Sequence, residues 1–223
     1  MFEYLIKQFR ELGKTFFFRY TPLGRPAYSY NLEPIQLAEI INQIERLRNQ
    51  DGNILEVGVA RGMTTKFSLT HLHSSGGLTS GKYIALDTFN SFPSDDLNYE
   101  VNKRGKKLWE LKGFSYISLK SWKKNFQNEE LLQIVQSDCK IYDYSRISPI
   151  KFALIDVDLY LPTLAALEGI YKELIRGGAI LIDDCKDDVL YDGAFMATKE
   201  FCNKYNLEYK RIGAKGALIV KTS

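Results

Sequence analysis

Cysteine, histidine and long apolar runs are scarce in this chain of 223 residues. The three cysteines (Cys139, Cys185 and Cys202) are odd in number and lack metal-type spacing, which argues against a disulfide framework and a zinc site. We therefore expect a reducing, cytoplasmic setting. No segment approaches the roughly 20 apolar residues that span a bilayer, so no transmembrane segment is predicted. Charged residues interrupt the apolar N-terminus, which argues against a secretory signal.

A large excess of one charge is also missing. The chain has 30 Lys and Arg against 27 Asp and Glu, a formal net charge of +3. So small a balance gives no reason to expect nucleic acid or an anionic membrane as the main partner. With 45% hydrophobic and 26% charged residues, the composition is that of a globular protein long enough for one α/β domain.

The first segment has the pattern of an amphipathic helix. Phe2, Leu5, Ile6, Phe9 and Leu12 recur at helical spacing among charged residues. A helix of this kind suits a lid, a dimer contact or a peripheral membrane anchor, and we favour the packing roles, which are compatible with a homodimer. We predict that residues 1–32 form an N-terminal helix with a turn-rich lid or dimer segment, and that residues 33–223 form the main domain.

Beyond residue 32, short apolar strands alternate with helical patterns. This alternation predicts an α/β fold, with a single Rossmann-like domain, a mostly parallel sheet and helices on both faces. An antiparallel C-terminal hairpin is predicted at residues 208–212 and 216–221. The polar residues 94–111 are expected to form a mobile loop or lid with some helix. The other predicted strands are 53–59, 82–86, 134–136, 151–155 and 179–182, and the other helices are 33–49, 64–73, 121–128, 129–134 (in part), 163–174 and 193–205.

A glycine-containing turn follows the first predicted strand. Ligands of parallel sheets bind beyond the carboxyl ends of the strands, and glycine lets the backbone approach a ligand closely. Gly58 and Gly62 are the glycines of this turn, and Asp87 ends the next strand. A carboxylate at that place is positioned to accept hydrogen bonds from both ribose hydroxyls of an adenosine.

A dinucleotide cofactor is the alternative for the same turn. The chain has Gly58-x-x-x-Gly62 and lacks the middle glycine of the phosphate-binding pattern G-x-G-x-x-G. Glu56 would also repel a pyrophosphate, whereas a cofactor with a cationic sulfonium tolerates an acid there. The turn therefore favours S-adenosylmethionine over a nicotinamide cofactor.

Four acids follow two later strands. Asp156 and Asp158 come after one strand, and Asp183 and Asp184 come after the next. Parallel strand ends share one edge of the sheet, so four carboxylates there would repel one another unless a cation or a proton lies between them. Hard oxygen ligands of this kind suit Mg²⁺. The alternative is that Asp158 or Asp184 caps the following helix.

These segments resemble a known family. Glu56-Val57-Gly58-Val59-Ala60-Arg61-Gly62 looks like the E-x-G-V-x-R-G motif of the macrocin and mycinamicin sugar O-methyltransferases (TylF/MycF type). The stretch from Asp87 to Pro93 resembles that family's D-S-F-x-G-x-P, with Thr88 for the serine. Asp156-Val157-Asp158-Leu159-Tyr160 is similar to D-G-D-L-Y, and Ile182-Asp183-Asp184-Cys185 to V-D-D-Y.

The resemblance implies a class I S-adenosylmethionine-dependent methyltransferase that uses Mg²⁺. The implied cofactor-binding residues are Glu56, Gly58, Val59, Arg61, Gly62, Asp87 and Thr88, with Asp138 for the adenine amino group. The implied Mg²⁺ ligands are Asp156, Asp183 and Asp184, and the implied catalytic residues are Asp158 as general base and Asp156. The expected enzyme is an O-methyltransferase that acts on a hydroxyl of a sugar or of a glycosylated small molecule.

Two other functions stay open at this point. A catechol-type O-methyltransferase would use a similar metal site on a small aromatic diol. A catalytically silent methyltransferase-like module would need none of the four acids. Among other residues, His71 and His73 are two apart and do not share a helix face, so we expect surface roles. For Trp122 we favour packing against other side chains over stacking on a sugar.

Overall fold

The structure is a computed structural model that describes residues 2–22, 27–111, 113–187 and 190–222. The chain divides into two compact units, Met1–Asn31 and Leu32–Ser223. In the first unit, helix α1 (Phe2–Tyr20) has no buried residue. None of the helices in the described ranges is long and apolar enough to cross a membrane.

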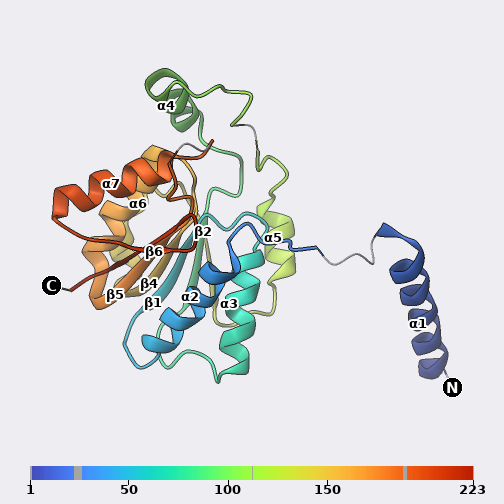
Figure 1. The fold of residues 1–223 in the computed structure, drawn as a ribbon. Helices are drawn as coiled ribbons and strands as arrows, with labels where there is room; N and C mark the ends of the chain where they lie inside the picture. The colour runs from blue at the N-terminus through green and yellow to red at the C-terminus, as the bar shows by residue number, and fades with distance from the viewer. Residues whose placement is uncertain (1, 23–26, 112, 188–189, 223) are drawn as a thin grey trace. The chain divides into compact units, whose positions relative to one another are not determined.

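The second unit is built on one seven-stranded sheet (Figure 1), with the strand order β3-β2-β1-β4-β5-β7-β6. The first five strands in chain order pair in parallel, and β7 pairs antiparallel with both β5 and β6. The predicted parallel sheet with an antiparallel C-terminal hairpin is therefore confirmed. The strands are β1 (Asn53–Val57), β2 (Tyr83–Asp87), β3 (Leu132–Gln136), β4 (Ile150–Ile155), β5 (Leu174–Ile182), β6 (Lys210–Ile212) and β7 (Gly216–Val220).

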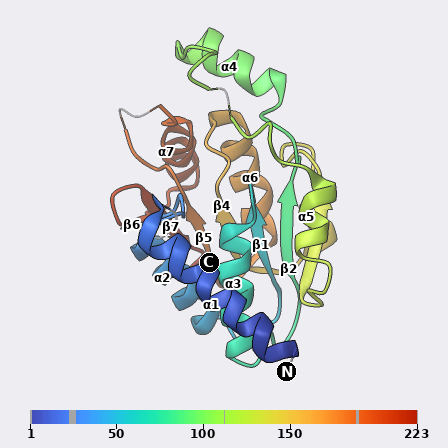
Figure 2. The ribbon, with the colours of Figure 1, turned by 90° about the vertical axis from the view of Figure 1, so that its right-hand side faces the viewer.

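Helices cover both faces of the sheet. Figures 1 and 2 show α2 and α3 on one face and α6 and α7 on the other. The main core lies where β4 and β5 meet α6 and α7, and it includes Leu167, Ile180 and Phe201, which are fully buried. Burying side chains of this size stabilises the fold by about 1.5–3 kcal/mol each. The helices are α2 (Pro34–Arg46), α3 (Met63–Ser74), α4 (Ser94–Arg104), α5 (Leu119–Asn125), the short 3₁₀ helix η2 (Tyr144–Ile147), α6 (Tyr160–Glu173) and α7 (Gly193–Tyr205).

Two predicted segments differ in the structure. Residues 94–104 form a regular helix, α4, where a mobile loop or lid with some helix was expected. The reason is tertiary: Glu100 is buried and accepts hydrogen bonds from the backbone N–H of Tyr160 at 2.8 Å and from Arg104 Nε at 2.7 Å. Residues 129–134 were expected to be partly helical, but the chain turns at Glu129 and enters β3 at Leu132.

Candidate active site

The carboxyl ends of three neighbouring strands lie side by side. Val57 of β1 is in register with Ile155 of β4, and Ile155 is in register with Ile182 of β5. The backbone ladder continues one step further, because Asp156 N–H donates to the carbonyl of Val57 at 2.8 Å and Asp183 N–H donates to that of Ile155 at 2.9 Å. The sheet therefore places the acids of two strands at one edge, as the sequence predicts.

The two glycines of the first turn are required by protein packing. Gly58 has φ +84°, and a Cβ there would lie 1.9 Å from the carbonyl oxygen of Asp156. Gly62 has φ +82°, and a Cβ there would lie 2.7 Å from the ring of Phe126. Close approach of the backbone after β4 and of an aromatic ring thus adds a reason for these glycines, and close approach of a ligand stays a prediction.

Glu56 lies inside the protein, with 1% of its surface exposed. Its Oε2 accepts hydrogen bonds from Thr65 Oγ1 and from Tyr83 Oη, both at 2.7 Å. Burial raises the pKa of Glu56 to about 7, against the lowering effect of those two hydroxyls. Glu56 therefore joins β1 to α3 and β2, and it is not among the residues that line the cavity described next.

A cavity of about 600 Å³, including its open mouth, lies over the strand ends. Figures 1 and 2 show α4 beyond this edge of the sheet, and Pro93 and Asp96 of that region form part of the cavity wall. The predicted site residues that line the cavity are Gly58, Asp87, Thr88, Asp138, Asp156 and Asp158.

The other predicted site residues lie outside the lining. Val59 is buried, Arg61 is exposed and Gly62 packs below Trp122 and Phe126. Asp183 and Asp184 lie beside the cavity acids without lining the cavity. The structure thus brings half of the predicted cofactor set to one cavity, and the cofactor roles of Glu56, Val59, Arg61 and Gly62 stay predictions.

Asp87 holds two loops together at the cavity wall. Its Oδ2 accepts hydrogen bonds from the backbone N–H groups of Val59 at 2.8 Å and Ala60 at 3.3 Å, and its Oδ1 accepts one from Phe89 N–H at 2.7 Å. Burial raises the pKa of Asp87, and these backbone donors oppose that rise. The carboxylate therefore fixes the loops after β1 and β2 as well as facing the cavity.

The cavity wall contains a further acid, Asp96, which was not predicted from the sequence. Asp96 of α4 is 1% exposed, its Oδ1 pairs with Lys140 Nζ at 2.5 Å, and its Oδ2 has no hydrogen-bond partner within the described ranges. Burial raises the pKa of Asp96 to about 6, and Lys140 lowers it. Nothing in the polar segment 94–111 singles Asp96 out.

Asp138 has two roles in the structure. It lines the cavity, and its Oδ1 accepts a hydrogen bond from Lys140 N–H at 2.9 Å, which closes a local turn. The side chain of Lys140 also approaches Asp138 at 3.4 Å. Asp138 is therefore a turn residue, and its place in the cavity wall is compatible with the predicted cofactor contact.

The four acids at the strand ends are close together and largely buried. Burial first, and then the neighbouring carboxyl groups, raise the pKa of Asp156 and of Asp158 well above the ordinary range. Asp158 is within hydrogen-bonding reach of Asp184. The alternative that Asp158 or Asp184 caps the following helix is wrong, because Leu159 is the N-cap of α6 and Asp192 is the N-cap of α7.

In this structure, two of the predicted magnesium ligands are already bound to other side chains. Asp183 Oδ1 accepts a hydrogen bond from Gln36 Nε2 at 2.7 Å, and its Oδ2 pairs with Lys215 Nζ at 2.8 Å. The same ammonium lies 2.8 Å from Asp184 Oδ1. Within the described ranges, no group of three or more His, Cys, Asp or Glu residues is arranged to hold a metal ion. As they stand, these residues do not fit Mg²⁺, because one lysine already pairs with two of the three proposed ligands.

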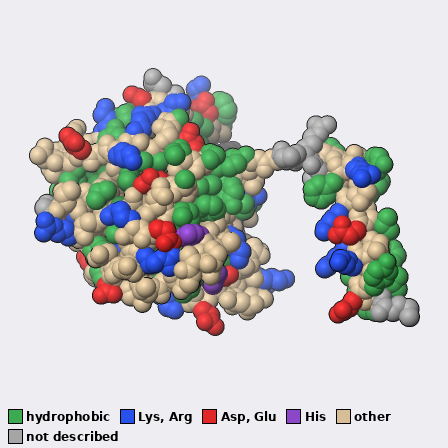
Figure 3. Space-filling view, turned by 60° about the horizontal axis from the view of Figure 1, so that its bottom comes forward, with side chains coloured by type: hydrophobic (Ala, Val, Ile, Leu, Met, Phe, Trp, Pro, Cys, Tyr) green, Lys and Arg blue, Asp and Glu red, His purple; other side chains and the backbone are tan. Residues whose placement is uncertain are grey.

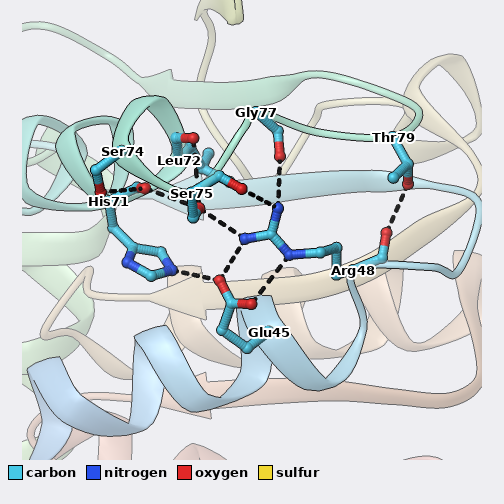
Figure 4. Close-up of polar contacts among 8 residues, drawn as sticks. All are labelled: Glu45, Arg48, His71, Leu72, Ser74, Ser75, Gly77 and Thr79. Atoms are coloured by element: carbon cyan, nitrogen blue, oxygen red, sulfur yellow. Dashed lines mark hydrogen bonds and ion pairs between the residues drawn. The ribbon is translucent and has the colours of Figure 1, made fainter.

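The two histidines of α3 form ion pairs with glutamates of neighbouring segments. His71 Nε2 lies 2.5 Å from Glu45 Oε1, and Arg48 approaches the same carboxylate at 2.5 Å (Figure 4). His73 pairs with Glu129 at 2.7 Å. These contacts join α3 to neighbouring segments, in agreement with the surface roles expected for both histidines.

Trp122 is a packed aromatic, as interpreted. Its side chain is 3% exposed, it stacks on Phe126 with ring centres 4.1 Å apart, and it meets the edge of Phe89 at 5.3 Å. Phe89 directly follows Asp87 and Thr88, which line the cavity, so Trp122 packs against the loop that carries them.

Comparisons with known proteins agree with this architecture. Residues 26–214 match the macrocin-O-methyltransferase (TylF) family. No curated protein matches the chain in sequence. The solved O-methyltransferase NovP is 20% identical with a TM-score of 0.71, and the match covers 89% of this chain and 84% of that one. The calicheamicin methyltransferase CalS11 is 16% identical with a TM-score of 0.65, covering 83% and 78%.

An O-methyltransferase from Bacillus cereus, solved in complex with SAH, is 15% identical with a TM-score of 0.53, and the match covers 89% of this chain and 84% of that one. At these identities the structural likeness shows the fold alone. It confirms the predicted class I methyltransferase architecture.

Proposed function

The chain belongs to the macrocin-O-methyltransferase (TylF) family and is an O-methyltransferase; we propose that it transfers a methyl group from S-adenosylmethionine to a hydroxyl of a sugar or of a glycosylated small molecule. The observation that carries this proposal is the cavity over the strand ends. Asp87 and Asp138 lie in its wall after β2 and β3, and Asp156 and Asp158 lie in its wall after β4. Two groups of acids, one for a nucleoside and one for an acceptor, thus share a single cavity.

The donor is proposed to lie along the ends of β1, β2 and β3. Asp87 is placed to accept hydrogen bonds from ribose hydroxyls, and Asp138 from the adenine amino group. The unpartnered Oδ2 of Asp96 adds a third acceptor for a hydrogen-bond donor of the bound molecule. The SAH complex of the Bacillus cereus protein, which has the same fold, supports this choice of donor.

The proposed reaction is an in-line displacement. The acceptor oxygen attacks the methyl carbon, the carbon–sulfur bond breaks, and its electron pair stays on sulfur, so that S-adenosylhomocysteine is released. The hydroxyl proton goes to the carboxylate of Asp158, which lines the cavity. The raised pKa of Asp158 makes it a stronger base once it is ionised. Asp156 is proposed to help hold the acceptor hydroxyl, and most of the remaining effect comes from positioning.

Ligand binding tests the donor assignment. We expect S-adenosylhomocysteine, and not NAD, to bind the purified protein in isothermal titration calorimetry. Asp138→Asn should weaken that binding about tenfold or more, because one charge-assisted hydrogen bond is lost. The exposed Glu208→Gln is the matched control and should bind as the wild type does. Binding of NAD without binding of S-adenosylhomocysteine would overturn the proposal.

The acceptor class is tested separately. A catechol-type enzyme would methylate small aromatic diols, and a silent module would methylate nothing while still presenting the fold. Radiolabelled S-adenosylmethionine offered with nucleotide-linked sugars, glycosides and catechols distinguishes these outcomes. We propose transfer to the sugars, in a reducing, cytoplasmic setting that the three free, buried cysteines support. Transfer to catechols alone would replace the sugar acceptor.

A further inference from the structure

The backbone of Lys215 is fixed on both sides in the turn between β6 and β7. Its carbonyl accepts a hydrogen bond from Cys185 N–H at 2.6 Å, directly after Asp183 and Asp184. On the other side, Glu33 Oε2 accepts hydrogen bonds from Ala214 N–H at 2.7 Å and from Lys215 N–H at 3.4 Å. The hairpin turn is therefore anchored directly beside the paired acids.

The side chain of Lys215 points at both of these acids. Its ammonium lies 2.8 Å from Asp183 and 2.8 Å from Asp184, and the lysine side chain is 23% exposed. Gln36 occupies the remaining oxygen of Asp183. A divalent ion that bound Asp183 would need an oxygen that Gln36 or Lys215 already holds, and two cations at one site would repel each other.

We propose that the ammonium of Lys215 is the resident cation of the acid cluster and takes the place of a divalent metal. Lys215 does not line the cavity, so it is a positioning residue: it holds Asp184, which reaches Asp158. Its role in turnover rests on the proposed methyl transfer, whereas its exclusion of metal does not. Mg²⁺ at Asp156, Asp183 and Asp184 is then not required by this chain.

Metal binding tests this inference without any acceptor. Free Mn²⁺ is followed by electron paramagnetic resonance as wild type, Lys215→Ala and Lys215→Arg are added. We expect no binding to wild type or to Lys215→Arg. Lys215→Ala should bind Mn²⁺ at least about tenfold more tightly than wild type, because the carboxylates of Asp183 and Asp184 lose their ammonium partner. Lys210→Ala, on the exposed part of β6, is the matched control and should behave as wild type.

Two further results decide the outcome. Adding Asp183→Asn to Lys215→Ala should remove the new Mn²⁺ binding. If wild type binds Mn²⁺ and Asp183→Asn abolishes that binding, the metal displaces the lysine and the inference fails. Turnover of wild type should be unchanged in EDTA, and loss of turnover there would also overturn it while leaving the proposed methyl transfer intact. Absence of turnover under all conditions would instead count against the proposed function.

An independent observation concerns helix α1. Successive residues of a helix advance by about 100°, which places most of the apolar side chains in one sector of about 140°, with Phe18 and Tyr4 outside it. Figure 3 shows hydrophobic side chains along one edge of α1 and charged side chains along the other. The apolar sector holds Leu12, Leu5, Phe16, Phe9, Phe2, Tyr20, Ile6 and Phe17, in angular order, together with Gly13.

Within the first unit, taken by itself, this sector is exposed and bordered by positive charge. Phe9 is 75% exposed and Leu12 is 66% exposed. Arg10 follows one border of the sector and Arg19 the other, and the helix carries four basic residues against Glu3 and Glu11. An apolar, aromatic face with basic borders fits the boundary between headgroups and acyl chains of an anionic bilayer.

We propose that α1 lies in the surface of an anionic membrane. Sedimentation with vesicles of phosphatidylglycerol and phosphatidylcholine tests this, and vesicles of phosphatidylcholine alone should bind about tenfold less protein. Phe9→Glu should abolish binding, because it places a charge in the apolar sector. Tyr4→Glu, the same charge change on the opposite side of the helix, should bind nearly as wild type.

A second copy of this chain is the competing occupant of the apolar sector of α1, and the mass in solution tests for it. Light scattering after size exclusion, without lipid, measures the mass of wild type and of Phe9→Glu. A dimer that Phe9→Glu converts to a monomer, together with no sedimentation on anionic vesicles, would show that a second copy covers this face and would overturn the membrane proposal. Equal sedimentation with both vesicle types would also overturn it, because the basic borders would then contribute nothing.

Discussion

A Cβ atom added to Gly58 would lie 1.9 Å from the carbonyl oxygen of Asp156. The turn after β1 and the end of β4 are thus packed backbone against backbone, and this contact fixes one edge of the cavity. We expect Gly58→Ala to lower the free energy of unfolding by about 3 kcal/mol or more, because the clash adds to the cost of a positive φ. Urea denaturation measures the loss.

Gly76→Ala is the matched control for that change. Gly76 also has a positive φ, +93°, but nothing lies within 4 Å of an added Cβ. Its substitution should cost only about 1 kcal/mol of backbone strain. Equal losses for the two variants would contradict the packing role of Gly58.

Glu56 predicts a dependence of stability on pH. Its pKa is raised from 4.5 to about 7, so between these values the unfolded chain releases a proton that the folded chain keeps. Stability is therefore full below pH 4.5 and falls as pH rises towards 7, by on the order of 3 kcal/mol. Glu56→Gln keeps an oxygen for Thr65 and Tyr83 and should remove this fall. Denaturation midpoints at pH 5 and pH 8 measure the difference, and an unchanged pH profile in the variant would contradict it.

Glu45 predicts the opposite dependence in acid. Its pKa is lowered to about 2 by the hydrogen bond from Arg48, which has the larger effect, and by that from His71. Figure 4 shows both contacts. Its contribution is present above the ordinary pKa of 4.5 and is lost as pH falls towards 2. Glu45→Gln should therefore make the protein less sensitive to acid in that interval, in circular dichroism at pH 2–5. Glu208→Gln, on an exposed segment, should leave the acid transition unchanged.

Asp158 is expected to control the rate of the chemical step. Asp158→Asn keeps the size of the side chain and removes the base, so kcat should fall about 10²–10⁴-fold. Affinity for S-adenosylhomocysteine should stay within a few-fold of wild type, since the proposed donor contacts are elsewhere. Single-turnover kinetics and calorimetry measure the two quantities, and a nearly unchanged kcat would remove Asp158 from the reaction.

Much of the site follows from local sequence patterns. Short apolar strands alternate with helices, so the parallel sheet and the meeting of Asp156 with Asp183 at one edge are predictable from the sequence. The family motif likewise indicated the macrocin-O-methyltransferase family, which the match over residues 26–214 shows. The helix α4 was less predictable, because the segment is polar and its helix is fixed by the contacts of Glu100 with Tyr160 and Arg104.

Most of the order of strands and helices along the chain, and the type of residue at each strand end, follow from the amino-acid sequence alone, because hydrophobic periodicity and strand length are local properties. Only the tertiary structure decided what those residues contact. It brought Gln36 and Lys215, 147 and 32 positions away from Asp183, onto the two oxygens of that carboxylate. It also turned Glu56 inward and left an oxygen of Asp96 buried without a hydrogen-bond partner within the described residues. Contacts of this kind depend on how distant segments pack, and no local pattern specifies them.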